Sequence, residues 1–434
     1  MKRPAYPHYK SSGVEWLGAV PEHWEVKRLK WVGESIIGLT YSPTDVVSEN
    51  EGTLVLRSSN IQGGRIVLND NVFVSADIPR KLRTRADDIL ICTRNGSREL
   101  VGKTGKISDR ESDLTFGAFT AVFRSPANAY MFYVFNSSLF SFQAGLYQTS
   151  TIFQLTNGTI NALQIPLPPP DEQQAIAAFL DRETGRMDLL LKKKHTLIER
   201  LKEKRTALIS HVVTRGLPPS AARAVGIDPH PPLKASGIEW LGDVPEHWEV
   251  KQLKWAIMFQ RGHDLPSDER EDGTIPLVTS SGTSTFVSKA AARGPGIVTG
   301  RYGTIGEFHL IDTDYWPLNT TLYSIELRGN HPPYLRYMLM HLAPLFLLNA
   351  VKSAVPGVDR NDIHPTATAV PPPPEQVAIT AYLDAETAKI DMLVSKVEGA
   401  IERLGEYRTA LITVAVTGKI DVRKAASTFA ARAN

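Results

Sequence analysis

The strongest constraint on the fold of this chain is a segment of twenty residues that occurs twice. Ser12–Trp31 reads SGVEWLGAVPEHWEVKRLKW and Ser236–Trp255 reads SGIEWLGDVPEHWEVKQLKW, so only three positions differ. A second repeat pairs PPPDEQQAIAAFLDRETGRMD, which starts at Pro168, with PPPPEQVAITAYLDAETAKID, which starts at Pro371. Two repeats in the same order indicate a tandem duplication in which each copy is one structural unit.

The segments between the repeats differ in length and in sequence. The front copies are 224 residues apart and the rear copies 203, so the first intervening segment is longer by 21 residues. Both segments contain short β-type runs, such as TLVLRSSN and GIVTGRYGTIGEFHL, separated by Gly, Asn, Asp and Pro. We expect two compact, mainly β domains with a few short helices, one of them near Tyr334–Leu342.

The rear repeat predicts a long helix in each copy. Prolines precede it, Glu172 and Glu375 lie in the first turn, where the helix dipole favours anions, and Gly216 and Gly418 stand at the far ends. From Glu172 to Thr214 such a helix would be about 65 Å long, at 1.5 Å per residue.

Apolar side chains, with Lys194 as the one charged exception, recur in steps of seven along both predicted helices, which is the spacing of a coiled-coil seam. The seam residues are Leu180, Met187, Lys194, Leu201 and Leu208 in the first helix and Leu383, Ile390, Val397, Leu404 and Leu411 in the second. Leu190, Leu191, Leu197, Ile198, Leu393, Val394 and Ile401 widen it. We predict that the two helices pair in antiparallel fashion within the chain. The alternative is that each stripe packs on its own domain.

These expectations define an α+β fold with a pseudo-two-fold tandem repeat. The expected segments are residues 1–166 and 236–370 for the two mainly β domains, 167–216 and 371–418 for the helices, 217–235 for a Pro-rich linker and 419–434 for a tail.

The composition, with 42% hydrophobic and 22% charged residues among 434, is typical of soluble protein with more than one core. Cys92 is the only cysteine, which excludes an internal disulfide and a cysteine-based metal cluster. Neither a membrane span nor a signal peptide is recognisable, so we expect a cytoplasmic protein. The net charge of +3 is too small to indicate nucleic-acid binding by itself.

Six of the seven tryptophans belong to the front repeats, at identical spacing. Tryptophans repeated in two otherwise different domains favour a shared packing frame over ligand binding. His23 and His247 lie beside them without further ligand residues at metal spacing, so we expect a structural role for both.

Short basic and polar runs in the two β-type segments indicate DNA binding. Between Arg80 and Lys106 eight basic residues face three acidic ones, and the run TRNGSREL offers donors and acceptors that can read base edges. The candidate DNA-binding residues are Arg94, Asn95, Ser97, Arg98, Lys103, Gln148 and Thr151 in the first half and Arg301, Tyr302, Thr304, Lys352, Arg360 and Asn361 in the second. Taken one at a time, such runs are more often solvated surface.

The sequence contains no recognisable catalytic arrangement. GSRELVGKT lacks the spacing of a phosphate-binding loop, and HPPY at His331–Tyr334 has no accompanying S-adenosylmethionine loop. A nuclease set of paired carboxylates and a convincing Ser/His/Asp set are also missing. We therefore expect no cofactor, no metal and no catalytic residue in this chain.

The duplicated pattern resembles the specificity (S) subunits of type I restriction-modification systems. The resemblance covers nearly the whole chain, and its carriers are WLGxVPEHWE, DILI with its glycine-containing loop, GRYGTIG and the helix entries LPPPDEQQAI and VPPPPEQVAI. It implies two target recognition domains that bind an asymmetric, bipartite site in double-stranded DNA. It also implies helices that space these domains and dock two modification (methyltransferase) subunits and the ATP-dependent restriction subunits, with all chemistry in the partners.

Two other classes remain open at this stage. A coiled-coil scaffold would not need cationic, Asn/Arg-rich loops in both domains. A self-contained DNA methyltransferase with its own reader would need a cofactor loop.

Overall fold

The structure, a computed structural model, describes residues 4–146, 154–302, 304–350 and 357–423. The chain divides into two compact units, Met1–Lys194 with Gly399–Asn434, and His195–Glu398. Unit 1 therefore contains the start of the first long helix, α4 (Pro170–Arg215), and the end of the second, α8 (Pro373–Val416). Unit 2 contains the end of α4 and the start of α8.

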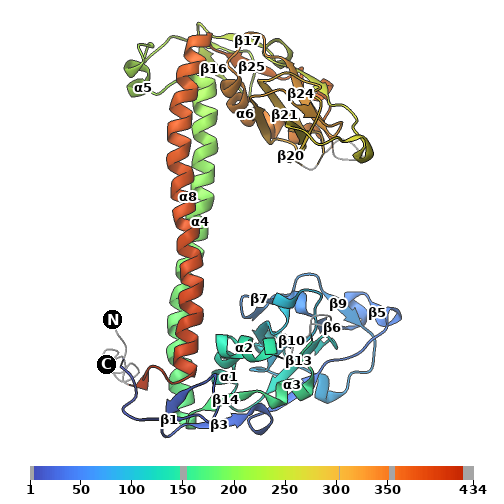
Figure 1. The fold of residues 1–434 in the computed structure, drawn as a ribbon, viewed down its shortest axis with the longest axis vertical. Coiled ribbons are helices and arrows are strands. Elements are labelled where there is room, and N and C mark those ends of the chain that lie inside the picture. The colour runs from blue at the N-terminus through green and yellow to red at the C-terminus, as the bar shows by residue number, and fades with distance from the viewer. Residues whose placement is uncertain (1–3, 147–153, 303, 351–356, 424–434) are drawn as a thin grey trace. The chain divides into compact units, whose positions relative to one another are not determined.

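Unit 1 contains a β domain with two sheets (Figure 1). The larger sheet has the order β4-β13-β10-β11-β8-β7 and the smaller one β12-β6-β9-β5. The elements are β1 (Tyr9–Ser11), β2 (Ala19–Pro21), β3 (Glu25–Arg28), β4 (Glu34–Ile37), β5 (Val46–Val47), β6 (Thr53–Leu56), β7 (Ile61–Gln62), β8 (Arg65–Ile66), β9 (Val72–Val74), β10 (Ile89–Cys92), β11 (Thr104–Lys106), β12 (Thr115–Phe116), β13 (Thr120–Arg124), α1 (Asn128–Phe135), α2 (Ser138–Leu146), α3 (Asn157–Ala162) and β14 (Gln164–Leu167).

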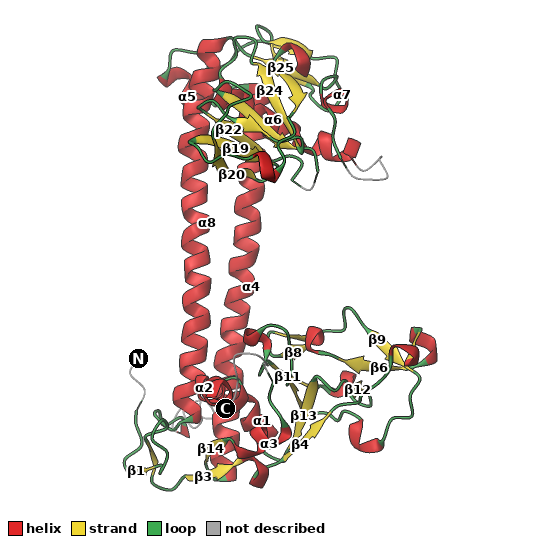
Figure 2. Ribbon diagram, turned by 45° about the vertical axis from the view of Figure 1, so that its right-hand side comes forward, coloured by secondary structure: helices red, strands yellow, loops and turns green. Residues whose placement is uncertain are grey.

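Unit 2 repeats this plan with fewer strands (Figure 2). Its sheets have the orders β18-β24-β21-β22 and β20-β19-β23. The elements are α5 (Pro219–Ala224), β15 (Leu233–Ala235), β16 (Asp243–Pro245), β17 (Glu249–Gln252), β18 (Met258–Arg261), β19 (Ile275–Thr279), β20 (Gly282–Val287), β21 (Gly296–Gly300), β22 (Phe308–Ile311), β23 (Trp316–Pro317), β24 (Thr321–Glu326), α6 (Pro332–Ala350), α7 (Arg360–Ile363) and β25 (Ala367–Val370). Helix α6 is longer than the short helix expected near Tyr334–Leu342. The expected linker also contains α5 and β15.

The two long helices pair in antiparallel fashion within each unit, so the predicted α+β fold with an intramolecular coiled coil is confirmed. In unit 1, Arg408 of α8 pairs with Asp188 of α4. In unit 2, the equivalent residues Arg205 and Asp391 pair at 3.1 Å. The Arg408 and Arg205 side chains are 25% and 28% exposed. The two equivalent pairs define the same antiparallel register in both units.

Burial along the helices follows the heptad spacing. Leu180, Met187, Leu383, Ile390 and Leu411 are buried, and Lys194, Leu201, Leu208, Val397 and Leu404 are partly buried. Of the residues expected to widen the seam, Ile198 is buried and Leu191, Val394 and Ile401 are partly buried, whereas Leu190, Leu197 and Leu393 are exposed. The inward positions alternate in steps of four and three residues, as in 187, 191, 194, 198 and 201. Leu190, Leu197 and Leu393 fall between these positions and therefore face outward. Because the helices are antiparallel, six residues after Asp188 on α4 correspond to six residues before Arg408 on α8. Lys194 therefore lies opposite Glu402.

Each β domain is fastened by two tyrosines at equivalent positions, one bonded to a long helix and one to the strand that precedes that helix. The Tyr133 hydroxyl donates to Asp181 at 2.5 Å, and the Tyr337 hydroxyl donates to Asp384 at 2.7 Å. Burial raises the pKa of both hydroxyls, so they remain donors in the physiological range. Tyr130 and Tyr334 donate to the carbonyls of Pro166 and Ala369.

Each front repeat packs against the end of the helix from the other half of the chain. Trp24 is fully buried beside Gly418, which follows α8, and Trp248 is fully buried beside Gly216, which follows α4. The Tyr9 hydroxyl donates to the Gly418 carbonyl at 2.9 Å. Both glycines have positive φ, so each ends its helix with the chain turning across a tryptophan.

The packing frame expected for all six repeated tryptophans holds for only part of them. Trp16 is partly buried, whereas its equivalent Trp240 is 42% exposed. Trp24 and Trp248 are buried as predicted, but Trp31 and Trp255 are exposed. Each of these two ends a short 3₁₀ turn whose first residue, a leucine, occupies the core, so its own side chain points outward. His23 and His247 contact the buried carboxylates of Glu172 and Glu375 at 2.7 and 2.8 Å.

Two histidines of unit 2 predict acid sensitivity. Burial lowers the pKa of His341, and burial together with the charge of Arg360 lowers that of His364, whose Nε2 accepts a hydrogen bond from the Phe259 amide at 3.0 Å. Because the folded-state pKa lies below the unfolded one, near 6.5, unfolding takes up protons in acid. The histidine contribution to stability is therefore complete above about pH 6.5 and is lost as the pH falls through the lowered pKa.

We expect the thermal unfolding midpoint to fall between pH 7 and pH 5, and to fall less in His364→Gln, whose amide oxygen can accept the same hydrogen bond without titrating. Scanning calorimetry across this range measures the difference. An identical pH dependence in both proteins would contradict the role of His364.

Candidate nucleic-acid interface

In the first β domain, four chain segments meet at one end of the sheets. They are residues 38–41 after β4, 57–59 after β6, 93–95 after β10 and 117–119 between β12 and β13, which together we call the first loop surface. Two backbone contacts hold them together. Leu39 forms a β-bridge with Gly117, and the Arg94 amide donates to the Phe119 carbonyl at 3.1 Å.

Two predicted residues, Arg94 and Asn95, lie on this surface. The Arg94 guanidinium lies 5.3 Å from the ring centre of Phe119, which is 59% exposed. The Asn95 amide donates to the Ser58 hydroxyl at 3.3 Å and accepts from the Ser97 amide at 3.0 Å. An arginine supported by an aromatic ring presents its donor edge to solvent in a restricted orientation.

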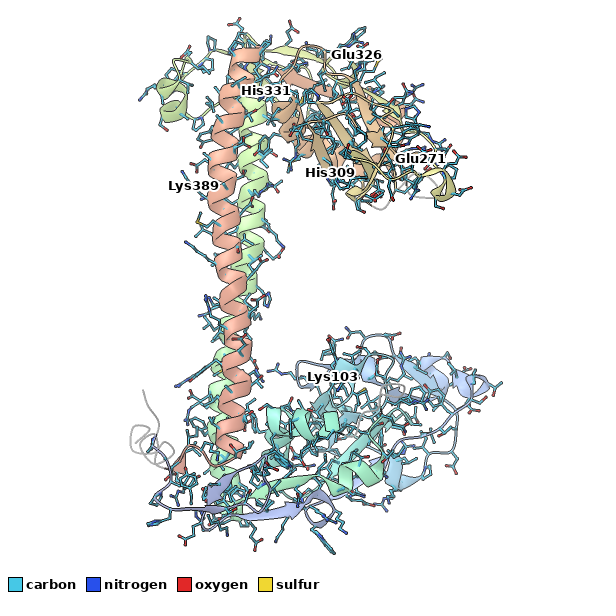
Figure 3. All side chains as sticks on the ribbon, viewed as in Figure 1. Lys103, Glu271, His309, Glu326, His331 and Lys389 are labelled. Atoms are coloured by element: carbon cyan, nitrogen blue, oxygen red, sulfur yellow. The ribbon has the colours of Figure 1, made fainter. Side chains whose placement is uncertain are left out.

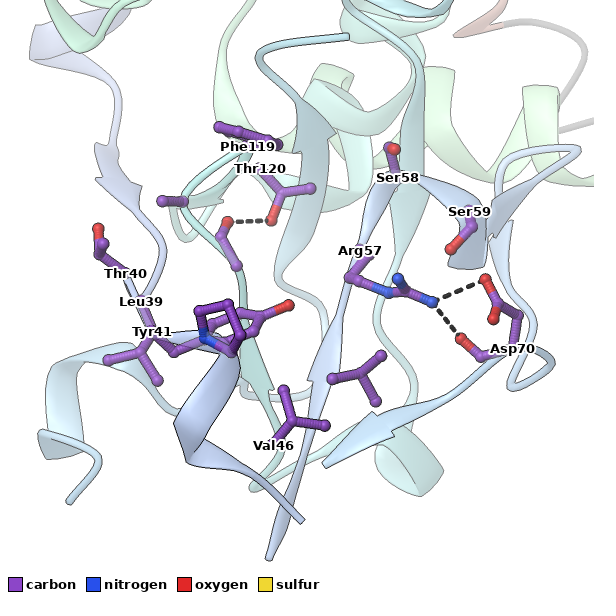
Figure 4. Close-up of a pocket in the computed structure, with 14 residues that line it drawn as sticks. Leu39, Thr40, Tyr41, Val46, Arg57, Ser58, Ser59, Asp70, Phe119 and Thr120 are labelled. Atoms are coloured by element: carbon purple, nitrogen blue, oxygen red, sulfur yellow. Dashed lines mark hydrogen bonds and ion pairs between the residues drawn. The ribbon is translucent and has the colours of Figure 1, made fainter. Parts of the chain in front are cut away.

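A cavity of about 670 Å³ opens beside these residues (Figure 4). Tyr41, Ser58, Ser59 and Phe119 line it together with Arg57, whose guanidinium bonds to the Asp70 carboxylate at 2.7 Å. In the sequence this side is marked only by the run RSSN, which belongs to the β-type run TLVLRSSN. The meeting of RSSN with Phe119 depends on the sheet order, which the sequence does not reveal.

Other predicted residues of the same loop face elsewhere. Arg98 and Lys103 line a second cavity, of about 780 Å³, between this loop, α2 and the helix pair of unit 1. Figure 3 labels Lys103 on the first β domain. Asp188 and Arg408 line its other side. Ser97 is exposed and lines neither cavity. Gln148 and Thr151 lie outside the described residues.

The second β domain has an equivalent second loop surface, made by residues 262–265 after β18, 280–281 after β19, 301–302 after β21 and 318–320 between β23 and β24. The same backbone contacts recur. His263 forms a β-bridge with Leu318, and the Arg301 amide donates to the Thr320 carbonyl at 2.9 Å. The Arg301 guanidinium again lies 5.3 Å from an aromatic ring, that of Tyr302.

The side chains on this common backbone differ between the two surfaces. Arg301 is only 14% exposed, and its guanidinium lies 3.9 Å from Asp359, so it is less accessible than Arg94. The Thr304 hydroxyl donates to the Ser280 carbonyl at 2.5 Å and supports the loop. Tyr302, Arg360 and Asn361 are exposed, and Lys352 lies outside the described residues.

His263, Asp264 and Asn319 also lie on the second loop surface, although no sequence motif marks them. The Asn319 amide donates to the Asp264 carboxylate, and His263 contacts the Tyr323 hydroxyl at 3.0 Å. These residues sit in runs that read as ordinary turns. The equivalence of the two surfaces was the signal that could have found them, since each corresponds in position to a residue of the first surface.

No three His, Cys, Asp or Glu side chains cluster as metal ligands in the described part of the chain. Within the same residues, no helix combines the length and apolar character needed to cross a membrane.

The sequence is similar to proteins of a known family. The family model described as type I restriction modification DNA specificity domain matches residues 21–200 and again 245–403. The EcoKI specificity subunit of Escherichia coli (strain K12), a type I restriction enzyme component, is 22% identical over 93% of this chain and 90% of its own length. The StySPI specificity subunit of Salmonella potsdam is 25% identical over 45% of this chain and 44% of its own.

A solved structure has the same fold. It comes from work on complex assembly and conformational transition of the type I R-M system, and it is similar to this chain with a TM-score of 0.69. The match covers 92% of this chain and 99% of the other at 16% identity, so it supports the fold alone.

Proposed function

Because the chain belongs to the type I restriction-modification DNA specificity family, we propose that its two loop surfaces read the two unlike halves of one double-stranded DNA site. The observation that carries this proposal is the pair of equivalent loop surfaces with different side chains. A common backbone with different donors and acceptors is what two half-sites of different sequence require.

On the first loop surface, Arg94 and Asn95 are the residues proposed to contact base edges, with Arg57 and Ser58 beside them. A bidentate arginine contact to guanine is the commonest specific contact in the major groove. The Phe119 ring, 5.3 Å from the Arg94 guanidinium, supports this role for Arg94 because it restricts the orientation of the side chain. Arg98 and Lys103, together with Ser97, Gln148 and Thr151, are proposed as backbone or flanking contacts. On the second loop surface Tyr302 takes the reading role, and Arg301 and Thr304 shape the loop. Arg360 and Asn361 of α7, outside that surface, are further candidates for DNA contacts, as is Lys352.

The chain is proposed to act without a cofactor and to leave the chemistry to its partners. Methylation then belongs to two modification subunits, and ATP-dependent translocation and cleavage belong to restriction subunits. Two equivalent exposed apolar pairs suggest where modification subunits dock, Leu189–Leu190 on α4 and Met392–Leu393 on α8. An apolar pair repeated on each helix suits a partner present in two copies.

We expect Arg94→Ala to weaken binding to the cognate duplex by about 1–3 kcal/mol and to relax the preference at one base pair of the first half-site. The preference in the second half-site should be unchanged. Binding to duplex libraries randomised in one half-site at a time measures both effects.

Arg110→Ala is the matched control, because Arg110 is an exposed arginine of the same domain that belongs to neither the first loop surface nor the two cavities. It should change affinity little. If Arg94→Ala weakens binding to every duplex equally, Arg94 contacts phosphate and not a base. If neither unit binds duplex DNA, the scaffold alternative gains support.

A further inference from the structure

The most exposed tryptophans of the two front repeats lie at equivalent positions, outside the cores. Trp31 is 73% exposed and Trp255 is 56% exposed. Core packing explains why Leu29 and Leu253, both fully buried, are the same in the two repeats. It does not explain two large aromatic rings that lie in solvent at the same position.

The local backbone presents both rings in the same way. Leu29–Trp31 and Leu253–Trp255 are 3₁₀ turns whose leucine amides donate to the carbonyls of Leu163 and Thr366, at 2.9 and 2.8 Å. Since the leucine is fixed in the core and its amide is fixed to the neighbouring strand region, the third residue of each turn must face outward. The backbone of each turn therefore determines that the tryptophan is exposed.

A lysine accompanies each ring. The Lys30 ammonium lies 5.0 Å from the centre of the Trp31 ring, and that of Lys254 lies 5.5 Å from the centre of Trp255, with Arg328 5.9 Å away. Neither lysine has an ion pair within the part of the chain that the structure describes. Each turn thus presents a broad apolar ring next to an uncompensated positive charge, a combination that suits a pocket rimmed by carboxylates.

The position of the rings favours a protein partner over DNA. Trp31 precedes β4, whereas the first loop surface follows it, and Trp255 has the same relation to β18 and the second loop surface. The length of a four-residue strand, about 13 Å, therefore separates each ring from the loop surface of its own domain. The loop surfaces differ between the two halves, but the Trp–Lys pair is the same, as contact with two copies of one partner requires.

We propose that the Trp31–Lys30 and Trp255–Lys254 pairs are equivalent docking points for an acidic surface of a protein that the assembly contains in two copies. The identification of that protein as the modification subunit rests on the proposed function. These points are separate from Leu189–Leu190 and Met392–Leu393, so each subunit would contact its unit at two places.

The test measures how many modification subunits of the same restriction-modification system bind, and how tightly, by sedimentation velocity with the full chain. The wild type should bind two copies. Trp31→Ala and Trp255→Ala should each weaken the binding of one copy by about tenfold or more, and the double variant should weaken both. Lys30→Glu with Lys254→Glu should have the same direction of effect and should remove part of the salt dependence.

Tyr407→Ala, which removes an exposed aromatic ring from α8, is the control and should bind both copies normally. Undiminished binding of two copies by the Trp31→Ala/Trp255→Ala double variant would overturn the docking proposal while leaving the proposed function intact. The docking proposal would also be overturned if the double variant bound both subunits normally but lost affinity for all duplexes equally. That result would show that the rings contact the DNA backbone. A wild-type chain that binds DNA but no modification subunit would overturn both the docking proposal and the proposed assembly.

Discussion

A chain in which Val32–Pro166 is replaced by its own segment Ala256–Ala369 should recognise a symmetric site made of two copies of the second half-site. Affinity for the original asymmetric site should fall by about a thousandfold, because each mismatched base pair costs roughly 1–3 kcal/mol and a half-site contains several. Selection from a random duplex library, or mapping of methylated adenines in the presence of modification subunits, measures the outcome.

The structure gives physical reasons why this exchange should fold. Both ends of each segment are held by one ladder, because Val26 of β3 pairs with Pro166 and Val250 of β17 pairs with Ala369. The incoming Tyr337 would meet Asp181 in place of Tyr133, since each tyrosine donates to the equivalent aspartate in its own unit. The anchoring contacts therefore survive the exchange.

The same exchanged chain with Tyr337→Phe in the inserted segment is the control, because it removes only the hydrogen bond that anchors the segment to the helix. It should lower stability without changing which bases are preferred. A site that changes in both halves after the exchange would show that the loop surfaces do not read DNA independently. An unchanged site would show that reading lies outside the exchanged segment.

The helices could be predicted because their signal is local and repeated. A seven-residue spacing that continues for several turns specifies one face of a helix, and Leu180 and Leu383 are fully buried on that face. The width of the seam was less predictable. Leu190 and Leu197 are as apolar as the seam residues, and only the geometry of the pair shows that they lie outside it.

The loop surfaces could be predicted only in part, since they depend on contacts between distant segments. Arg94 was found because it stands in a basic, polar run. Arg57 and Phe119 were missed because their neighbourhood arises from the pairing of β6 with β12 and of β10 with β13. The exposure of Trp31 could not be predicted, because the sequence LKW is compatible with two kinds of 3₁₀ turn. One buries both the leucine and the tryptophan, and the other buries only the leucine, as this turn does.

A fragment that ends at Gly216 should form a two-fold dimer and should not persist as a folded monomer. Unit 1 draws part of its core from the end of α8, where Leu411, Ile412, Ala415 and Val416 are buried. The fragment lacks these residues. Its own α4 carries Leu208, Ile209, Val212 and Val213 at the equivalent positions, so a second copy of the fragment can fill the gap with side chains of similar size.

The ion pair at the inner side of the helices makes this dimer testable. Arg205 is equivalent to Arg408, so in the dimer it should pair with Asp188 of the other copy, twice because of the two-fold axis. Lys194 should not oppose dimerisation. It lies opposite Glu402 in the whole chain, and Glu199 is the equivalent residue in the fragment.

Asp188→Arg in the fragment should weaken the dimer by about tenfold or more, because two pairs of opposite charges become two pairs of like charges. Adding Arg205→Asp should restore it, since the swapped charges attract again. Lys193→Asp, a charge change at an exposed position, should have little effect. Sedimentation equilibrium gives the dissociation constants. If the double variant stays as weak as the single one, residue 205 does not meet residue 188 across the axis, and the end of α4 cannot be taking the place of the end of α8.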